Sequence, residues 1–413
     1  MENGVLHVAI VVAGLGAGGA ERVISLLSGG WVAEGRRVTV IAFDREDDPL
    51  FHPLDARVEV IRLGIGSGGV RAVLRRCRAL RQVLDRLVPD ITLSFLTKIN
   101  VLTLLACLGR RRRVIVSERN NPRMQKASGG WNLAFRWLSG GATAIVMQTH
   151  ASLECLGPAA RRRAIVIPNP IMVGAVRREE GPSRVLAAVG RLTWQKGFDR
   201  LIDAFARVAD RHPDWTLRIW GEGEARAALE DRIAGHGLGD RIMLPGTSRS
   251  PDAWVAEADA FVLSSRFEGF CNALGEAMAA GLPVVSFDCA YGPAEVIRHG
   301  EDGLLVRDGD VDALAAALDR LLENATLRTR LGTAAKVAME HYRPPVILDR
   351  WNALLAGVMD QGRPFSPLLS ESRNSSRLVQ PLPSRTAQAS NLSGSAPCAI
   401  SQSSDIPSPS RSG

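Results

Sequence analysis

The sequence predicts an α/β protein with two parallel sheets, each covered by helices. Apolar runs of strand length alternate with helix-like amphipathic segments from residue 5 to about residue 340. A stretch rich in proline and glycine at 167–183 divides this series into two. Both halves begin with a strand, a glycine-bearing turn and a helix, at 9–27 and 185–205. We therefore expect two Rossmann-like domains facing each other, with ligands in the cleft at the carboxyl ends of both sheets.

The expected strands follow from the apolar runs in order along the chain. Near-continuous apolar strands are typical of parallel sheets whose two faces are both buried. The 413 residues, 46% of them hydrophobic, also exceed what one ordinary core needs. The first domain (1–172) is expected to contain strands at 5–12, 37–43, 58–63, 91–95, 113–117, 143–147 and 164–167. The second (183–340) is expected to contain strands at 184–189, 216–220, 241–244, 260–264, 283–287 and 304–306.

The composition changes after residue 360. Residues 361–413 hold 15 Ser and 7 Pro, with five Arg against two acidic residues. Such a segment buries too little apolar surface to offset the entropy of an ordered chain, so we expect a disordered tail. The tail carries +3 of the net charge of +8, which leaves the folded part only moderately basic.

The basic balance and the cysteines restrict the class of protein. A pI near 9.7 favours an acidic partner, such as nucleic acid, a membrane surface or a phosphorylated substrate. No zinc-finger, helix-turn-helix or interleaved aromatic pattern supports nucleic acid. The six cysteines are scattered without a C-x-x-C pair, which indicates reduced thiols in the cytoplasm. No apolar run reaches 18 residues, and Glu2 stands where a signal peptide would be basic, so the N-terminus is assigned to the fold.

A glycine-rich turn follows the first apolar run. Gly14, Gly16 and Gly19 match G-x-G-x-x-G, and Asp44 ends the next apolar run, where dinucleotide-binding folds keep an acid for ribose. The turn by itself indicates only that an anion closely approaches a helix N-terminus. A dinucleotide-dependent oxidoreductase and another user of nucleotides both remain open at this point.

Charged residues in the second half favour a nucleotide-binding protein other than a dinucleotide-dependent oxidoreductase. Arg191 and Lys196 lie on the loop after the first strand of that half, and a pair of cations at the carboxyl end of a sheet indicates a diphosphate clamp. Glu268 and Glu276 stand eight residues apart, bracketing a turn and the start of a helix. An ordinary solvated loop and surface acids explain each residue singly, but not all four together.

These residues carry a resemblance to a known family. "GGAER", "GRLTWQKG" and the E-x7-E pair followed by "GLPVVSFD" are similar to the family 4 retaining glycosyltransferases of the GT-B fold, from residue 5 to about 357. "GAGGAER", "SFLTKIN" and "VIVSERNNP" resemble bacterial enzymes that extend lipid-linked saccharides, of the N-acetylgalactosaminyltransferase or amylovoran type. The resemblance implies an acceptor-binding first domain, a second domain for the nucleotide sugar, and a C-terminal helix at 341–360 that crosses back to the first domain. The expected anchors of this helix on the first domain are Tyr342, Ile347, Trp351 and Leu355.

The resemblance also implies roles for single residues. Arg191 and Lys196 would neutralise the departing diphosphate, Glu268 would lie near the sugar hydroxyls, and Glu276 would accept hydrogen bonds from the ribose. The G-x-G-x-x-G turn then becomes a phosphate-approach loop, and Asp44 a strand-end acid without a ribose. Further residues expected to contact the nucleotide sugar are Gly16, Gly18, Gly19, Gly190, Gly269, Phe270, Cys271 and Asn272.

The first domain departs from the family where some members keep a histidine after the fifth strand. Ser117, Glu118 and Arg119 stand there instead. Glu118 or Asn120 is the preferred contact to sugar or acceptor, and a structural role is the preferred interpretation of His150, the alternative histidine. Lys98 and Asn100 complete the acceptor candidates. The D-x-D at 308–310 precedes a helix, so we interpret Asp310 as its N-cap and expect neither a metal nor a cofactor.

An arginine-rich amphipathic helix at 70–87 has two interpretations. It is either an ordinary solvated face or a surface that rests on anionic lipid, near a polyprenyl-diphosphate acceptor. The aromatic segment 131–138 enters either the membrane interface or the core. We therefore predict a cytoplasmic, peripheral-membrane transferase that uses a nucleotide sugar. A UDP-sugar is favoured, and the transferred sugar is a hexose or an N-acetylhexosamine, with UDP-N-acetylhexosamine as one candidate. A transferase with a soluble acceptor is the alternative, and a non-catalytic nucleotide- or sugar-binding protein is a distant one.

Overall fold

The computed structural model describes residues 4–16, 18–66, 68–119, 129–172, 184–248 and 253–360. The tail expected to be disordered and most of the expected linker lie outside these residues. The division into domains at 172 and 183 therefore stays a prediction.

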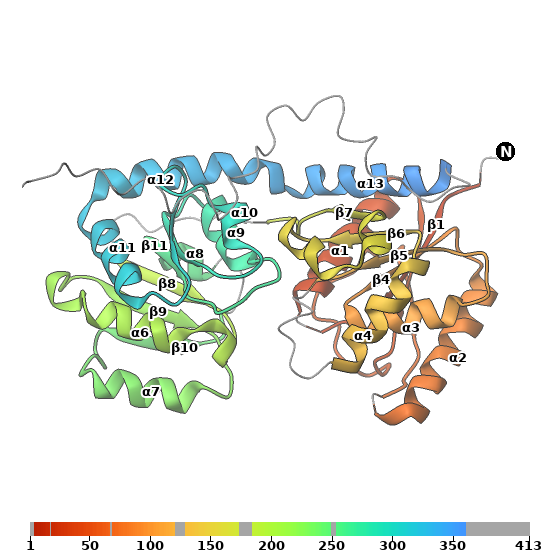
Figure 1. Ribbon diagram of the computed structural model, residues 1–413, viewed down its shortest axis with the longest axis horizontal. Coiled ribbons are helices and arrows are strands. Elements are labelled where there is room, and N and C mark those ends of the chain that lie inside the picture. Colours follow the sequence, from red (N-terminus) through yellow and green to blue (C-terminus); the bar gives the residue numbers. More distant parts are fainter. Residues whose placement is uncertain are drawn as a thin grey trace, which may run out of the picture. The chain divides into compact units, whose positions relative to one another are not determined.

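The first half is built on a seven-stranded parallel sheet with the order β3-β2-β1-β4-β5-β6-β7 (Figure 1). Successive residues of β1 contribute to different hydrophobic clusters on the two faces of the sheet: Val8, Ile10 and Val12 to one, Ala9 and Val11 to the other. The strands are β1 (His7–Val12), β2 (Arg37–Ala42), β3 (Glu59–Arg62), β4 (Ile91–Phe95), β5 (Arg113–Ser117), β6 (Ala144–Met147) and β7 (Ala164–Val166).

Helices cover both faces of this sheet. One cluster takes in α1 (Gly19–Ala33), and the other takes in α2 (Gly69–Leu87), α3 (Thr97–Cys107) and α4 (Gly129–Leu138). The short α5 (Pro158–Arg161) lies between β6 and β7 in the sequence. Each crossover from strand to helix to parallel strand brings the chain back to the same edge, so the loops after the strands gather there.

The second half repeats the architecture with a six-stranded parallel sheet in the order β10-β9-β8-β11-β12-β13. Its strands are β8 (Val185–Val189), β9 (Thr216–Trp220), β10 (Ile242–Gly246), β11 (Ala260–Leu263), β12 (Val284–Asp288) and β13 (Leu304–Arg307). Its helices are α6 (Phe198–Ala206), α7 (Arg226–Gly235), α8 (Ala253–Glu257), α9 (Asn272–Ala279), α10 (Pro293–Val296), α11 (Val311–Glu323) and α12 (Ala325–Ala338).

The predicted fold class is confirmed, and all thirteen strands lie within two residues of their expected positions. The pattern was informative because these strands are buried on both faces and separated by amphipathic helices. The N-cap interpretation of Asp310 is also confirmed, since its carboxylate accepts the N–H of Ala313 at 2.9 Å.

The last described helix, α13 (Pro344–Asp360), belongs to the core of the first half (Figure 1). Trp351 is fully buried and meets Trp31 edge-on, with ring centroids 6.3 Å apart. Asn352 accepts the indole N–H of Trp31 at 3.0 Å. Of the four residues expected to anchor this helix, Ile347, Trp351 and Leu355 pack there. Tyr342 does not.

Tyr342 packs against the second half instead, with its ring 5.8 Å from that of Phe270. Its carbonyl accepts the N–H of Ile171 at 2.8 Å. The reason is its position before the helix: Tyr342 ends a 3₁₀ turn (Met339–Tyr342) that continues α12, which packs on α9 and α11 of the second half.

We predict that α13 is required for the stability of the first half. Trp351→Ala should lower the free energy of unfolding by roughly 3–5 kcal/mol, because a large buried ring leaves a cavity. Urea unfolding followed by circular dichroism measures this. Val337→Ala on α12, where the side chain is 67% exposed, should change stability by less than about 0.5 kcal/mol.

Truncation gives a second test of the same prediction. A chain ending at 360 keeps α13 and should melt at the temperature of the full chain, whereas a chain ending at 340 should melt lower. Equal melting temperatures for the two truncated chains would contradict the role of α13.

Candidate functional site

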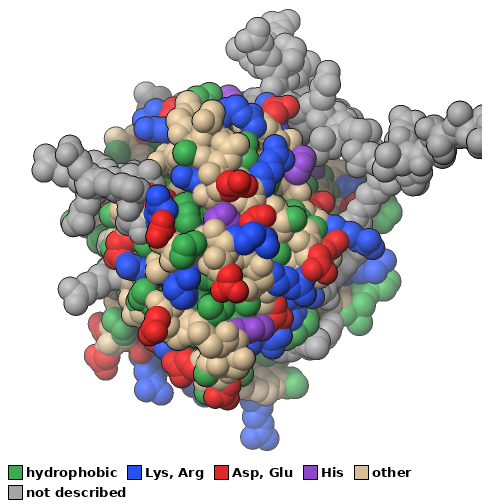
Figure 2. Space-filling model, turned by 90° about the vertical axis from the view of Figure 1, so that its left-hand side faces the viewer, with side chains coloured by type: hydrophobic (Ala, Val, Ile, Leu, Met, Phe, Trp, Pro, Cys, Tyr) green, Lys and Arg blue, Asp and Glu red, His purple; other side chains and the backbone are tan. Residues whose placement is uncertain are grey.

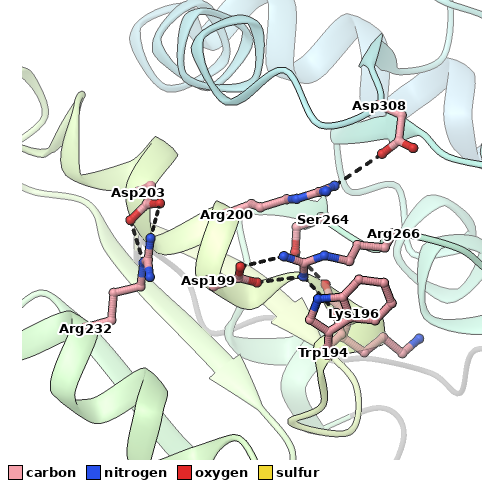
Figure 3. A network of polar contacts seen from close by, with 9 residues as sticks. All are labelled: Trp194, Lys196, Asp199, Arg200, Asp203, Arg232, Ser264, Arg266 and Asp308. Carbon is pink, nitrogen blue, oxygen red and sulfur yellow. Dashed lines mark hydrogen bonds and ion pairs between the residues drawn. The ribbon is translucent and has the colours of Figure 1, made fainter.

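The loop after β8 is held in close contact with the segment after β11. Gly190 lies against the stem of Lys196, and a Cβ there would stand 2.9 Å from Cε. Gly197 has a φ of +64°, and its Cβ would meet the Ser264 carbonyl oxygen at 2.2 Å. The Ser264 hydroxyl donates to the Lys196 carbonyl at 2.9 Å (Figure 3). Glycine is required at position 197, where φ is positive and the close atom is backbone, whereas a Cβ at position 190 would displace the Lys196 stem. This packing fixes where the Lys196 side chain begins.

Arg266 also stabilises the loop after β8, through hydrogen bonds to Asp199 and to the backbone of Trp194. It donates two hydrogen bonds to Asp199, at 2.8 and 2.6 Å, and a third to the Trp194 carbonyl at 2.8 Å. Its guanidinium also lies 4.7 Å from the centroid of the Trp194 ring (Figure 3). A bidentate pair of this kind fixes geometry as well as charge. Arg266 was not among the residues predicted from the sequence, although it stands two residues before Glu268.

Lys196 and Glu268 form an ion pair that is largely shielded from solvent. Lys196 Nζ lies 2.7 Å from Glu268 Oε1, and the Ser265 hydroxyl donates to the same oxygen at 2.5 Å. Burial alone would lower the pKa of Lys196, but the carboxylate of Glu268 outweighs this effect and the pKa is raised. Lys196 is therefore a fixed cation at neutral pH. Arg191 is exposed, and its charge acts against that of Lys196.

Glu276 lies on α9, where its side chain is 10% exposed, and it is paired with a residue of the first half. Arg22 Nη1 stands 2.5 Å from Glu276 Oε1, and Arg22 Nη2 donates to the Met172 carbonyl at 3.2 Å. Arg22 follows the glycine loop on α1. Arg22 was not among the residues predicted from the sequence, although it is the last residue of the "GGAER" motif.

Asn272, at the start of α9, is one end of a buried polar chain. Its Oδ1 accepts from Asn169 Nδ2 at 2.8 Å, and Asn169 Oδ1 accepts from Arg119 at 2.5 Å and from Gln148 at 2.7 Å. The Arg119 guanidinium lies 5.6 Å from the centroid of the Trp351 ring. Burial lowers the pKa of Arg119 to about 9. This series of hydrogen bonds connects the E-x7-E segment with the core of the first half.

The other residues expected to bind the nucleotide sugar lie on two segments. Gly16 and Gly18 are exposed in the glycine loop, and Gly18 is the N-cap of α1. A Cβ on Gly19 would stand 2.9 Å from Asn272 Nδ2, so this loop meets the E-x7-E segment. Three more, Gly269, Phe270 and Cys271, lie between Glu268 and α9, where burial raises the pKa of the Cys271 thiol well above its ordinary value.

The carboxylate of Asp44 is hydrogen-bonded to the backbone of the glycine loop in the first half. Its Oδ2 accepts the N–H of Leu15 at 2.9 Å and lies 3.7 Å from Arg62. A Cβ on Gly14 would stand 3.1 Å from the same oxygen. This contact supports the interpretation of Asp44 as a strand-end acid that has no ribose to bind.

The acceptor candidates of the first half are not brought together on one surface. Lys98 is exposed, whereas Asn100 is buried and bonded to Ser94 and to the Ser117 carbonyl. Glu118 is 1% exposed and accepts from the Thr97 hydroxyl at 2.7 Å. Asn120 lies outside the described residues. These positions favour a structural role for the buried pair.

His150 is exposed, and the contact made at this position is through the backbone. The carboxylate of Glu295, from α10 of the second half, accepts the N–H of His150 and of Ala151, both at 2.7 Å. The assignment of the imidazole to sugar or acceptor stays a prediction. Within the described ranges, no three His, Cys, Asp or Glu side chains form a group that could hold a metal ion.

We predict that Glu268 sets the protonation of Lys196. In Glu268→Gln, burial is no longer opposed by a negative charge, so the pKa of Lys196 should fall and more of the amine should be neutral at pH 8. Trace acetylation followed by peptide mass spectrometry should then show faster labelling of Lys196. Lys98 and Lys336, both exposed, serve as internal references. Unchanged relative labelling of Lys196 would show that Glu268 does not control this pKa.

Comparisons with known proteins agree with this architecture. The model of the group 1 glycosyl transferases matches residues 175–338, and that of glycosyltransferase family 4 matches residues 17–173. The chain is 34% identical over 289 residues to an exopolysaccharide phosphotransferase of Streptomyces coelicolor, which covers 69% of this chain and 30% of that protein. It is 35% identical over 173 residues to an amylovoran biosynthesis glycosyltransferase of Erwinia amylovora, covering 42% and 48%. The chain thus spans less than half the length of these two relatives.

Solved structures share the fold at lower identity. HepE of Anabaena, crystallised with UDP and glucose, has a TM-score of 0.72 at 20% identity, covering 85% of this chain and 99% of that one. The sucrose-phosphate synthase of Thermosynechococcus elongatus has a TM-score of 0.74 at 19% identity, covering 86% and 99%. Two family models that together span residues 17–338, and a fold of two parallel sheets shared with these structures, show that the chain belongs to the family 4, group 1 glycosyltransferases of the GT-B fold.

Proposed function

We propose that this protein is a retaining glycosyltransferase that moves a sugar from a nucleotide sugar to a saccharide acceptor in polysaccharide assembly. The observation that carries the proposal is the shielded Lys196–Glu268 pair beside the exposed Arg191, on loops that follow β8 and β11 of the second sheet. In open parallel sheets, ligands bind at these carboxyl ends. Membership of the family supports the same assignment.

The site chemistry follows from where charge develops. As the bond between sugar and diphosphate breaks, negative charge grows on the departing diphosphate, and Arg191 and Lys196 stabilise it. Lys196, which Glu268 already holds, does so without having to reorganise. Glu268 holds the ammonium in place and lies near the sugar hydroxyls. Retention requires the new bond to form on the face that the leaving group departs from. Membership of the family implies that the leaving phosphate itself takes the proton of the acceptor hydroxyl.

For the donor we propose a UDP-sugar. HepE was crystallised with UDP and glucose, and a poly(ribitol-phosphate) N-acetylglucosaminyltransferase of Staphylococcus aureus is 24% identical to this chain over 208 residues. The transferred sugar that we propose is a hexose or an N-acetylhexosamine. Thermal-shift measurements against UDP-, GDP- and ADP-sugars test the base, and hydrolysis of UDP-glucose against UDP-N-acetylglucosamine tests the sugar.

For the acceptor we propose a lipid-linked saccharide at an anionic membrane surface. The exposed side of α2 carries Arg71, Arg75 and Arg78 beside Val70 and Leu74, which are 76% and 51% exposed. Both α2 and α4 pack against α3 (Figure 1). Basic residues next to exposed apolar ones are typical of surfaces that bind anionic lipid.

The aromatic segment of α4 has side chains both in the core and on the surface, the two locations considered for it from the sequence. Phe135 is buried in the core, whereas Trp137 is 80% exposed and Leu133 is 59% exposed. Among the described residues, no helix has both the length and the apolarity that crossing a bilayer requires. An interfacial contact through α2 and α4 is therefore the form of membrane association that we propose.

The second half has a different surface. Figure 2 shows acidic and basic side chains interspersed on that side of the molecule, and many of them are paired, as Arg207 is with Asp312 and Arg232 with Asp203. Paired charges attract anionic lipid weakly, which favours the first half as the membrane-facing one.

We predict different kinetic effects for the clamp and for the ribose contact. Lys196→Ala should lower kcat by about 10²–10³, because the ammonium acts on charge that develops during the reaction. Glu276→Gln should instead raise the donor KM and leave kcat nearly intact, since a ribose hydrogen bond is present before and during bond breaking.

Steady-state kinetics with donor varied at saturating acceptor measure both effects. A Lys196→Ala variant altered only in KM, or a Glu276→Gln variant without turnover at saturating donor, would contradict this division of roles.

We also predict that α2 contributes to membrane binding. Replacing Arg71, Arg75 and Arg78 with Glu should reduce sedimentation with phosphatidylserine vesicles, since each basic residue near such a surface contributes roughly 1 kcal/mol. Unchanged binding would favour the solvated-face interpretation and a soluble acceptor. The control makes the same change in charge on exposed residues of the second half: Arg298, Arg320 and Arg330.

A further inference from the structure

Arg22 is where α1 of the first half meets α9 of the second. Its guanidinium stands 2.5 Å from the carboxylate of Glu276, a residue 254 positions later in the chain. The two side chains are only 22% and 10% exposed. Beside them, the backbone at Gly19 approaches the Asn272 side chain so closely that a Cβ would stand 2.9 Å from Nδ2. The helix that follows the glycine loop therefore lies against the segment that carries Glu276.

The guanidinium of Arg22 has a second acceptor besides Glu276, and its backbone is set in α1. Its backbone N–H donates to the Gly18 carbonyl at 3.2 Å within the first turn of α1, and Nη2 donates to the Met172 carbonyl at 3.2 Å. Because the guanidinium is planar, a hydrogen bond from one Nη restricts the direction of the other. Nη1 is thus aimed at Glu276 Oε1.

We propose that Arg22 is a positioning residue for the nucleotide, which acts by fixing the carboxylate of Glu276 in the orientation that receives the ribose hydroxyls. This inference rests on the proposed function, in which Glu276 contacts the ribose. A carboxylate has about four lone-pair directions, so it accepts from Arg22 and from hydroxyl groups together. Donor affinity therefore depends on α1 lying against α9.

The pair is not needed merely to join the two halves, because other contacts do so. Asn169 donates to Asn272 at 2.8 Å, and Glu295 accepts two backbone N–H groups at 2.7 Å, from His150 and Ala151. Loss of Arg22 should leave these contacts in place. The effect of Arg22 should accordingly appear in nucleotide affinity rather than in the melting temperature.

The experiment is a double-mutant cycle on UDP binding. The dissociation constant of UDP is measured by calorimetry for the full chain, for Arg22→Gln, for Glu276→Gln and for the double variant. A hydrogen bond to a charged group corresponds to about a tenfold or larger change in binding. Each single variant should weaken UDP binding by about that factor, and the double variant should bind no more weakly than Glu276→Gln alone.

Two further variants separate positioning from a general structural effect. Arg22→Lys keeps a cation that reaches Glu276, so it should recover part of the lost affinity. Glu295→Gln weakens a different contact between the halves and should leave UDP affinity unchanged. In Arg22→Gln, the donor KM should rise in parallel with the dissociation constant while kcat stays near that of the unmodified chain.

Three results would overturn the inference. One is full additivity of Arg22→Gln and Glu276→Gln, which would mean that the two residues act independently. Another is a loss of kcat in Arg22→Gln with unchanged UDP affinity, which would mean that Arg22 stabilises the charge on the departing diphosphate. The third is an equal loss of affinity in Glu295→Gln. The proposed function fails separately, if the full chain binds no nucleoside diphosphate or if Lys196→Ala leaves kcat unchanged.

Discussion

The ion pair between Lys196 and Glu268 is the interaction on which the candidate site depends. A shielded ammonium is costly unless a carboxylate compensates it, and Glu268 does so at 2.7 Å. The pair also requires the loop after β8 and the segment after β11 to pack closely. Gly190 and Gly197 leave no Cβ between the loops, Ser264 bonds to the Lys196 backbone, and Arg266 joins Asp199 to the Trp194 carbonyl. The surrounding structure fixes the ammonium before any substrate is present, which is what electrostatic stabilisation of a leaving group requires.

A second constraint is the burial of polar groups between the halves. Arg119 occupies a position where burial lowers its pKa to about 9, and two of its nitrogens, Nε and Nη2, have no hydrogen-bond partner among the described residues. The aromatic rings of Phe95 and Trp351 face its guanidinium at 5.2 and 5.6 Å. Trp351 belongs to α13, so this helix both completes the hydrophobic core of the first half and packs against the guanidinium of Arg119. Arg119 in turn donates to Asn169, which donates to Asn272. Stability of the first half and geometry of the E-x7-E segment are thus linked.

The sequence by itself determined the fold class, all thirteen strands and the loops that carry the charged residues. These features are local: strand runs, amphipathic periodicity and glycine-bearing turns depend on residues a few positions apart. The placement of Arg191, Lys196 and Glu268 on loops after the strands followed from the same local pattern, because parallel strands bring their carboxyl ends to one edge. Asp310 was recognised in the same way, as a cap directly before a helix.

Only the tertiary structure decided which side chains meet. Arg22 and Glu276 are separated by 254 residues, and Asn169 and Asn272 by 103, so no local pattern indicates either contact. Glu118 was expected at an acceptor surface because it stands where some family members keep a histidine, and Asn100 was a further candidate. Both are buried instead: Asn100 bonds to the end of β5, and Glu118 accepts from Thr97 at the start of α3. Tyr342 was assigned to the first half and packs on the second, because it ends the turn that continues α12. Periodicity predicts which face of an element is buried, but the partner across that face depends on how whole elements are placed.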